Sequence, residues 1–383
     1  MKVSREILYP VMLLLISLPL YSRGEGEEGS VPLKLGAAWT GDFVTNLTGG
    51  LKRGSCYLGM ATITAQFDTE AARLWKRGSI YVKAANTHGA TPSSELFGDA
   101  QVSSNIEAGN HTFIMELWIR QRFGNVELTA GLQDLNAEFA VSGNGSLYLN
   151  SSFGIMPVIT GNIPAPVFPL TSPGLTMVWD INGNLSLASA LFDGRPTEFD
   201  YNPYNTNWQI NSGDGILAVT ELRSKMVING YRGEYKIGLY THTHFIEKRI
   251  NRRFPDSLHR AVSGGYIIAD QNVLQSGYRS LSLFLQAGYS PSRDSFTDFS
   301  LGFGVNVTGV LSMKGNDAAG IAFTQSRFRN DAGSEIALEI TYMNQLTENI
   351  FIQPDLQYIL FPSGRQSRTP HCLAGIFRMG LSF

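Results

Sequence analysis

Apolar and polar residues alternate along most of the chain. In "FSLGFGVNV" (residues 299–307), phenylalanine, leucine and valine occupy every second position, and serine, glycine and asparagine lie between them. The segments "LSLFLQAGY" (281–289), "EIALEITY" (335–342) and "TFIMELWIRQR" (112–122) repeat this alternation. Because successive side chains of a strand point to opposite faces, each segment predicts a β-strand with one apolar face. The protein is therefore expected to be all-β.

Turn residues separate the predicted strands. Glycine, asparagine and aspartate gather at residues 49–50, 182–184 and 329–333, where they favour tight turns. Prolines gather once, in "MPVITGNIPAPVFPLTSPG" (156–174), which predicts an irregular loop on the surface or inside a barrel lumen. Pro354 interrupts an alternating segment and predicts a bulge or a register break, because proline lacks a backbone donor.

The last segment, "LAGIFRMGLSF" (373–383), ends on an aromatic residue. Its odd-numbered positions are mostly apolar, and its even-numbered positions include Arg378 and Ser382. A soluble core strand fits this pattern, and so does a transmembrane barrel strand with a lipid face and a polar lumen face. At roughly 20–25 residues for a strand and its turn, the mature chain would form about 14–18 strands, a number typical of porins.

The N-terminus predicts export. Lys2 and Arg5 precede an apolar run over residues 7–20, and small or polar residues follow, as in a secretory signal peptide. We expect residues 1–24 to be this peptide and residues 25–383 to form a single barrel domain. The chain has 43% hydrophobic residues, and no later apolar run is long enough for a membrane-spanning helix.

Charge and motifs exclude several functions. The formal net charge of the 383 residues is −2, so the basic surface typical of nucleic-acid binding is absent. The sequence contains no nucleotide-binding, phosphate-binding or nucleophile motif, and we expect neither enzymatic activity nor a cofactor. His242 and His244 share one strand face without further ligands in view, so no metal site is expected either.

Several segments resemble the carbohydrate-selective porin family (OprB-type porins) of Gram-negative bacteria. The strongest is "AGLQDLNAEFAVSGNGSLYLNSSFGIMP" (130–157), and "LFDGRP" (191–196), "GGYIIADQ" (264–271) and the closing "FRMGLSF" follow in order. The resemblance implies a sixteen-stranded antiparallel barrel in the outer membrane, through which sugars diffuse passively. A general diffusion porin, a secreted soluble all-β carbohydrate-binding or carbohydrate-cleaving protein, and an outer-membrane barrel enzyme are the alternatives.

Polar residues of the alternating segments are the candidates for selecting solutes in the lumen, where a channel exchanges hydration for its own donors and acceptors. The candidate lumen residues are Arg120, Arg122, Arg378, Glu116, Glu335, Glu339, Asp355, Trp118 and Gln357. A terminal aromatic on an alternating last strand is similar to the signal that the barrel assembly machinery recognises. The residues of this expected assembly signal are Phe377, Met379, Leu381 and Phe383.

Two further expectations concern partners and cysteines. The basic run at residues 247–260 is a candidate contact for lipopolysaccharide phosphates in the outer membrane, because arginine pairs well with phosphate. The sequence leaves a homo-oligomer open. Cys56 and Cys372 are the two cysteines, and each is expected near the outer rim beside the closure of the barrel. They are the candidate pair for a disulfide, and two free thiols are the alternative.

Overall fold

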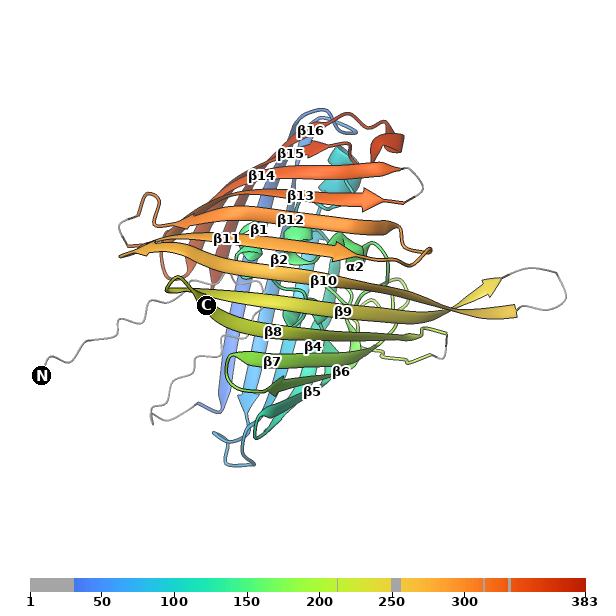
Figure 1. Ribbon diagram of the computed structural model, residues 1–383, viewed down its shortest axis with the longest axis vertical. Helices are drawn as coiled ribbons and strands as arrows, with labels where there is room; N and C mark the ends of the chain where they lie inside the picture. The colour runs from blue at the N-terminus through green and yellow to red at the C-terminus, as the bar shows by residue number, and fades with distance from the viewer. Residues whose placement is uncertain (1–30, 212, 249–255, 313, 330–331) are drawn as a thin grey trace, which may run out of the picture.

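The computed structural model describes residues 31–211, 213–248, 256–312, 314–329 and 332–383, without the side chains of residues 244–260. The expected signal peptide (1–24), the side chains of the basic run and the side chain of His244 lie outside this description. Sixteen strands form one closed antiparallel barrel in which β1 pairs with β16 (Figure 1). The predicted all-β barrel is therefore confirmed.

The strands follow one another around the barrel in chain order. They are β1 (Leu33–Thr48), β2 (Gly54–Asp68), β3 (Gly78–Gly89), β4 (His111–Phe123), β5 (Val126–Gln133), β6 (Ser172–Asp180), β7 (Leu185–Asp193), β8 (Ile216–Ile228), β9 (Tyr231–Lys248), β10 (Asp256–Ser276), β11 (Arg279–Tyr289), β12 (Thr297–Thr308), β13 (Asp317–Phe328), β14 (Gly333–Gln345), β15 (Ile350–Leu360) and β16 (Cys372–Ser382). Among the described residues, no helix is long and apolar enough to cross a membrane.

The alternation predicted from the sequence separates the two faces of the barrel wall. On β12, Phe303 and Val305 are exposed on the outside, whereas Ser300 and Asn306 are buried on the inside. The outer face is therefore an apolar band suited to lipid, and the inner face is polar, as expected for a transmembrane barrel.

The two ends of the barrel differ in their connections. The end that carries the last residues of β16 has tight turns such as 124–125 and 229–230, and the opposite end has long loops. Short turns face the periplasm and long loops face the outside in outer-membrane barrels. We call three of the long loops L2 (residues 90–110), L3 (134–171) and L4 (194–215).

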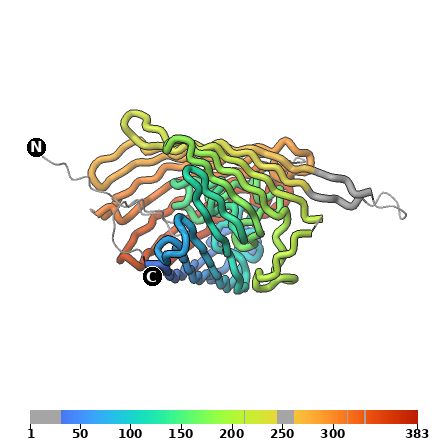
Figure 2. The backbone as a smooth tube through the Cα atoms, turned by 90° about the horizontal axis from the view of Figure 1, so that it is seen from below, coloured from blue at the N-terminus to red at the C-terminus, as the bar shows by residue number. Residues whose placement is uncertain are grey.

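L3 lies inside the barrel, so the proline-rich segment is a lumen loop. It contains four short helices, which are η2 (Leu135–Ala137), η3 (Gly145–Leu147), α1 (Ser151–Gly154) and α2 (Pro157–Thr160). Figures 1 and 2 show its green turns within the ring of strands. L2 carries η1 (Ser93–Phe97), and η4 (Arg365–Ser367) lies in the loop before β16.

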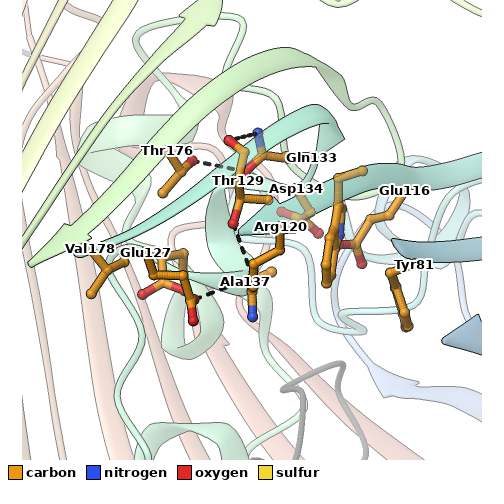
Figure 3. Close-up of a pocket in the computed structure, with 12 residues that line it drawn as sticks. Tyr81, Glu116, Arg120, Glu127, Thr129, Gln133, Asp134, Ala137, Thr176 and Val178 are labelled. Carbon is orange, nitrogen blue, oxygen red and sulfur yellow. Dashed lines mark hydrogen bonds and ion pairs between the residues drawn. The ribbon is translucent and has the colours of Figure 1, made fainter. Parts of the chain in front are cut away.

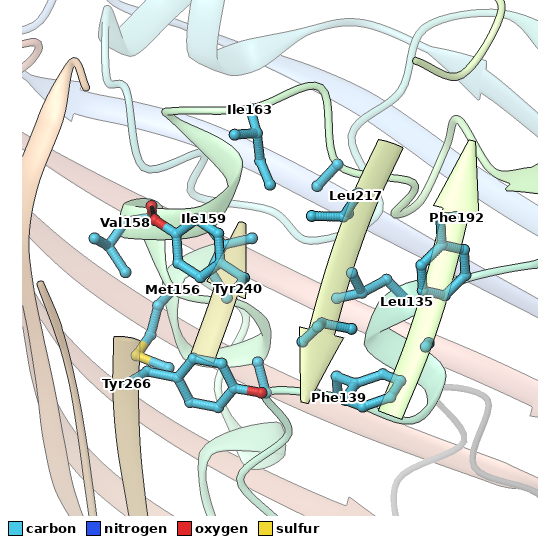
Figure 4. Packing of buried hydrophobic residues seen from close by; sticks show 14 of the residues in the cluster. Leu135, Phe139, Met156, Val158, Ile159, Ile163, Phe192, Leu217, Tyr240 and Tyr266 are labelled. Carbon is cyan, nitrogen blue, oxygen red and sulfur yellow. Dashed lines mark hydrogen bonds between the residues drawn. The ribbon is translucent and has the colours of Figure 1, made fainter. Parts of the chain in front are cut away.

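Apolar packing fixes L3 against the inner faces of β7 to β10. Met156, Val158 and Ile159 are buried in one cluster with Tyr240 and Tyr266 of the wall (Figure 4). The Tyr240 hydroxyl also donates a hydrogen bond to the carbonyl of Val158. Complete burial of each such aliphatic side chain contributes about 1.5–3 kcal/mol before the entropy cost of ordering the loop.

Pro354 does not cause the register break predicted from the sequence. Thr341 pairs with Asp355, and Asn344 pairs with Ile352 in the same register after two skipped positions. On the other side, Pro354 pairs with Phe377 without a shift. That prediction was wrong, because the lost donor is accommodated by a local gap in pairing and not by a slip of the strand.

Candidate functional site

A one-residue bulge in β4 shapes the inner wall. Lys83 of β3 pairs with Glu116, but the next residue, Ala84, pairs with Ile114, which leaves Met115 as the extra residue. A bulge reverses the alternation beyond it. Phe113 and Met115 are consequently buried on the same side as Glu116. Regular alternation over residues 112–122 predicts that both side chains lie on the face opposite Glu116. That prediction was wrong, because the bulge shifts the alternation by one residue.

Beyond the bulge, the inner faces of β3 to β6 and the start of L3 enclose a pocket in the lumen (Figure 3). We call it the lumen pocket. It is lined by Tyr81, Glu116, Trp118, Arg120, Glu127, Thr129, Gln133, Asp134, Ala137, Glu138, Thr176 and Val178. Three of the residues predicted from the sequence, Glu116, Trp118 and Arg120, are thus brought together.

A stack of side chains forms one wall of this pocket. The rings of Tyr81 and Trp118 are stacked with centroids 4.9 Å apart, and the Arg120 guanidinium carbon lies 4.5 Å from the Trp118 ring centroid. The indole Nε1–H donates to Glu116 Oε2 at 3.0 Å. Trp118 therefore holds Arg120 and Glu116 in place and leaves the polar groups of these two residues to meet a solute.

Arg120 is oriented by its neighbours on β5. Its Nε donates to Thr129 Oγ1 at 3.0 Å and lies 3.3 Å from Glu127 Oε1. Among the described residues, no protein acceptor is recorded for its two Nη groups. The guanidinium is consequently fixed along one edge, and its other edge offers donors toward the lumen.

Lys83 is a further charged residue beside Glu116, and the sequence did not predict it. It pairs with Glu116 across β3 and β4, and both side chains are buried. Its only sequence signal was its position two residues after Tyr81, between the apolar Val82 and Ala84. Burial raises the pKa of Asp134, in L3, to about 7, and the nearby Glu116 carboxylate adds to this rise.

These groups suit a neutral, hydroxyl-rich solute. Arg120 lies close to the Glu127 carboxylate, and Glu116 also lines the pocket, so the pocket offers both donors and acceptors at fixed positions. Such donors and acceptors exchange hydrogen bonds with the hydroxyl groups of a solute as these lose water. Within the described part of the chain, no group of three His, Cys, Asp or Glu side chains is placed to hold a metal ion.

The other predicted lumen residues do not line this pocket. Arg378 is buried and forms two hydrogen bonds with Asp42, at 2.7 and 2.8 Å. Gln357 donates to the carbonyl of Ser103 in L2 at 2.8 Å. Glu335, Glu339 and Asp355 are also buried on this side of the lumen. These five side chains face inward and contact protein, and their part in solute selection stays a prediction.

Arg122 also lies outside the lumen pocket. Its Nε donates to the carbonyl of Gly124 at 3.1 Å, in the turn between β4 and β5. It is therefore a residue of the periplasmic end.

The two cysteines are free. Cys56 lies on β2 and Cys372 on β16, and β1 pairs with both strands and separates them. Two strand spacings amount to about 9–10 Å, whereas a disulfide needs Cα atoms within about 7 Å. The disulfide considered from the sequence is therefore not formed.

A second cavity, of about 390 Å³, lies among L3, L4 and β9. His242 is buried at its base, with Nε2 2.6 Å from the carbonyl oxygen of Gly194. Arg195 and Glu198 form an exposed ion pair at 3.1 Å on its rim.

The comparison with family models decides the classification. The model described as carbohydrate-selective porin, OprB family, matches residues 52–383. The chain belongs to this family. Membership identifies a transport channel of the outer membrane, and the predicted resemblance is confirmed. A search of curated proteins found no match.

Solved structures share the fold of this family member at low sequence identity. The high-pH structure of Pseudomonas putida OprB is 18% identical, with a TM-score of 0.82, and the match covers 92% of this chain and 94% of that chain. Its low-pH structure is 17% identical with a TM-score of 0.60, over 92% and 93%. OmpF of Salmonella typhi is 8% identical with a TM-score of 0.55, over 92% and 97%.

Proposed function

We propose that this protein lets carbohydrates diffuse passively down their gradient, with selection in the lumen pocket. The observation that carries the proposal is the fixed arrangement of Arg120 and Glu116 beside the Trp118–Tyr81 stack. A hydroxyl-rich solute passing L3 meets a donor edge and carboxylate acceptors together, so its hydroxyl groups replace water without a large penalty. The step involves binding and release, and no covalent bond changes.

The remaining expectations from the sequence belong to this proposal. We infer that residues 1–24 are removed on export and that the barrel assembly machinery recognises the last strand through Phe377, Met379, Leu381 and Phe383. Phe377 and Phe383 are exposed, which supports their availability to a partner. Outer-membrane lipid and lipopolysaccharide are the expected surroundings of the apolar band, and a homo-oligomer remains compatible with it.

Liposome swelling tests the function. Refolded protein in liposomes is challenged with neutral sugars of increasing size and with amino acids of similar mass. We expect faster swelling with monosaccharides than with amino acids, and a smaller difference for the Arg120→Ala variant. Arg122→Ala is the matched control, because it removes the same group outside the lumen pocket.

The alternatives correspond to distinct outcomes. Equal swelling with sugars and amino acids would identify a general diffusion porin. Absence of swelling, for protein whose folding is shown by a heat-dependent shift in gel mobility, would contradict an open channel.

A further inference from the structure

Carboxylates of the barrel wall bind the backbone of the lumen loops. Glu339 of β14 is the clearest case. The amide of Leu149 donates to its Oε1 at 2.5 Å, and the amide of Asn150 donates to its Oε2 at 3.1 Å. Glu339 is completely buried. Both oxygens therefore accept a backbone donor from L3.

Asp270 of β10 binds L3 in the same way. The amides of Gly143 and Asn144 each donate to it at 3.1 Å, and the hydroxyl of Ser142 donates at 2.7 Å. Three consecutive residues of L3 thus converge on one carboxylate. This contact lies on another part of the wall from Glu339, so L3 is held at two separate places.

Glu221 of β8 links the start of L3 to the lumen pocket. It accepts the amide of Ala140 at 2.9 Å and the Nε–H of Arg223 at 2.6 Å. Arg223 also forms an ion pair with Glu138 and donates to its carbonyl at 2.7 Å. Because Glu138 lines the pocket, Glu221 fixes one of the pocket's own walls.

Glu335 lies on β14, the strand that also carries Glu339, and it binds the backbone of L2. It accepts the amides of Ala100 and Gln101 at 2.7 and 2.8 Å, and that of Ser363 at 2.5 Å. The residues at positions 335 and 339 share the inner face of β14, about 13 Å apart.

L2 and L3 also bind each other directly. The amide of Asn105 donates to the carbonyl of Leu149 at 2.8 Å, and the amide of Ser151 donates to that of Val102 at 2.9 Å. The two loops therefore form one layer that β14 carries on one side of the lumen. Displacing either loop from β14 would disturb the other.

We propose that these wall carboxylates are positioning residues that set the width of the lumen pocket. The proposal rests on the proposed function in one respect, which is that the pocket is where solutes are selected. The anchor carboxylates are Glu221, Asp270, Glu335 and Glu339. Glu221, Asp270 and Glu339 bind main-chain amides of L3, and Glu335 binds main-chain amides of L2, so together they fix the path of the loop layer. Loss of an anchor releases the loop layer and widens the passage.

The main test is Glu339→Gln in the full-length, membrane-inserted protein. Glutamine keeps one acceptor oxygen, but its NH₂ group is a donor. This group would face the N–H of Leu149 or Asn150, and that hydrogen bond would be lost. We expect a larger single-channel conductance and a sugar-to-amino-acid swelling ratio closer to one. Chymotrypsin cleavage within residues 139–153, followed by mass spectrometry, should become about tenfold faster or more, because a lost buried acceptor weakens local packing.

The matched control is Glu348→Gln, the same substitution at an exposed site in the turn between β14 and β15. It should leave all three measurements unchanged. Asp270→Asn is the second test variant, because its site is separate and its loss leaves Glu339 in place. Folding of every variant is checked by the heat-dependent gel shift.

The possible results separate this proposal from the function. Unchanged conductance and cleavage in both folded test variants would overturn the anchoring role. Faster cleavage with unchanged conductance and swelling ratio would also overturn it, since the anchors would then stabilise the loop without setting the passage. If the wild type showed no sugar preference while Glu339→Gln still raised conductance, the proposed function would fail and the anchoring role would stand.

Discussion

At the scale of single residues, the lumen pocket depends on side chains that hold other side chains. Trp118 has Tyr81 on one ring face, Arg120 near the ring and Glu116 at its N–H. Its contribution is therefore geometric, and the groups that it holds carry the charge. Two substitutions separate these roles.

Arg120→Lys tests the guanidinium. Lysine keeps the positive charge, but it loses the planar stack on Trp118 and the fork of donors. We expect sugar affinity to fall by about 1 kcal/mol, or roughly fivefold. The measurement is the sugar concentration that half-blocks the ion current through a single channel. An unchanged half-blocking concentration would contradict the role of Arg120, and Arg122→Lys is the control.

Trp118→Phe tests the indole N–H. Phenylalanine keeps a ring between Tyr81 and Arg120 but removes the donor to the buried Glu116 carboxylate. Because the buried Glu116 side chain then lacks this hydrogen bond, we expect the free energy of unfolding to fall by about 1–3 kcal/mol. Urea unfolding in detergent, followed by the gel shift, measures it. Tyr81→Phe is the control, and equal stability of both variants would count against this role of the N–H group.

At the scale of elements, a bulge in β4 decides which of its side chains face the lumen, and buried acidic side chains make the packing of L2 depend on pH. The bulge at Met115 turns Phe113 inward, where its ring lies 4.8 Å from that of Phe199 in L4. L2 brings acidic groups into contact with the wall. Each feature gives a prediction.

Deletion of Met115 removes the bulge. Ile114 and Phe113 then keep the pairing that they already have with Ala84 and Ala85, so Phe113 stays inward and its contact with Phe199 is retained. We therefore expect a folded barrel that loses only the packing of the Met115 side chain. Met115→Ala retains the extra residue and should lower the free energy of unfolding by about 2–5 kcal/mol through the cavity alone. A deletion variant that fails to fold, while the alanine variant folds, would contradict this expectation and show that the bulge itself is required.

L2 should pack more firmly in acid than in alkali. Burial raises the pKa of Asp99 from its usual 3.8 to about 6 and that of Glu107 from 4.5 to about 7. Glu95, Glu335 and the Cys372 thiol surround them. Since the folded-state pKa values are raised, the stability they contribute is fully present below about pH 4 and is lost as the pH rises through 6 to 7.

Hydrogen exchange measures this dependence. After correction for intrinsic rates, amides of residues 99–107 should exchange faster near pH 8 than near pH 5. Asp99→Asn removes one titrating group and should reduce the difference. A difference of equal size in this variant would assign the effect to other groups.

At the scale of the whole molecule, closure of the barrel separates residues that the sequence placed near one seam. β1 pairs with β16 on one side and with β2 on the other, so Cys372 and Cys56 lie on either side of it. The order of the strands thus decides whether the two cysteines can form a disulfide, which their positions in the sequence left open.

We therefore expect no disulfide. The thiols are first alkylated in the folded and in the unfolded state. The denatured protein should then migrate identically on gels with and without reductant. Mass spectrometry should find both cysteines alkylated after unfolding without reductant. A bridged peptide containing Cys56 and Cys372 would contradict the separation by β1.

The sequence by itself determined the all-β class, the sidedness of most strands and the family. It could do so because alternation is a local property, and burial in lipid demands one apolar face from each strand. The same reasoning found Glu116, Trp118 and Arg120, which lie on one strand and therefore share a face wherever that strand goes. The proline-rich segment was also predicted to leave the regular sheet.

Only the tertiary structure decided which of the inward-facing polar residues line the lumen pocket. Arg378, Glu335 and Glu339 have the same alternating pattern as Arg120, but Asp42, L2 and L3 occupy them. Their partners lie more than a hundred residues away in the chain, so no local pattern reports them. The path of L3 across the lumen depends on where the barrel places carboxylates opposite its amides, and this placement exists only after the barrel has closed.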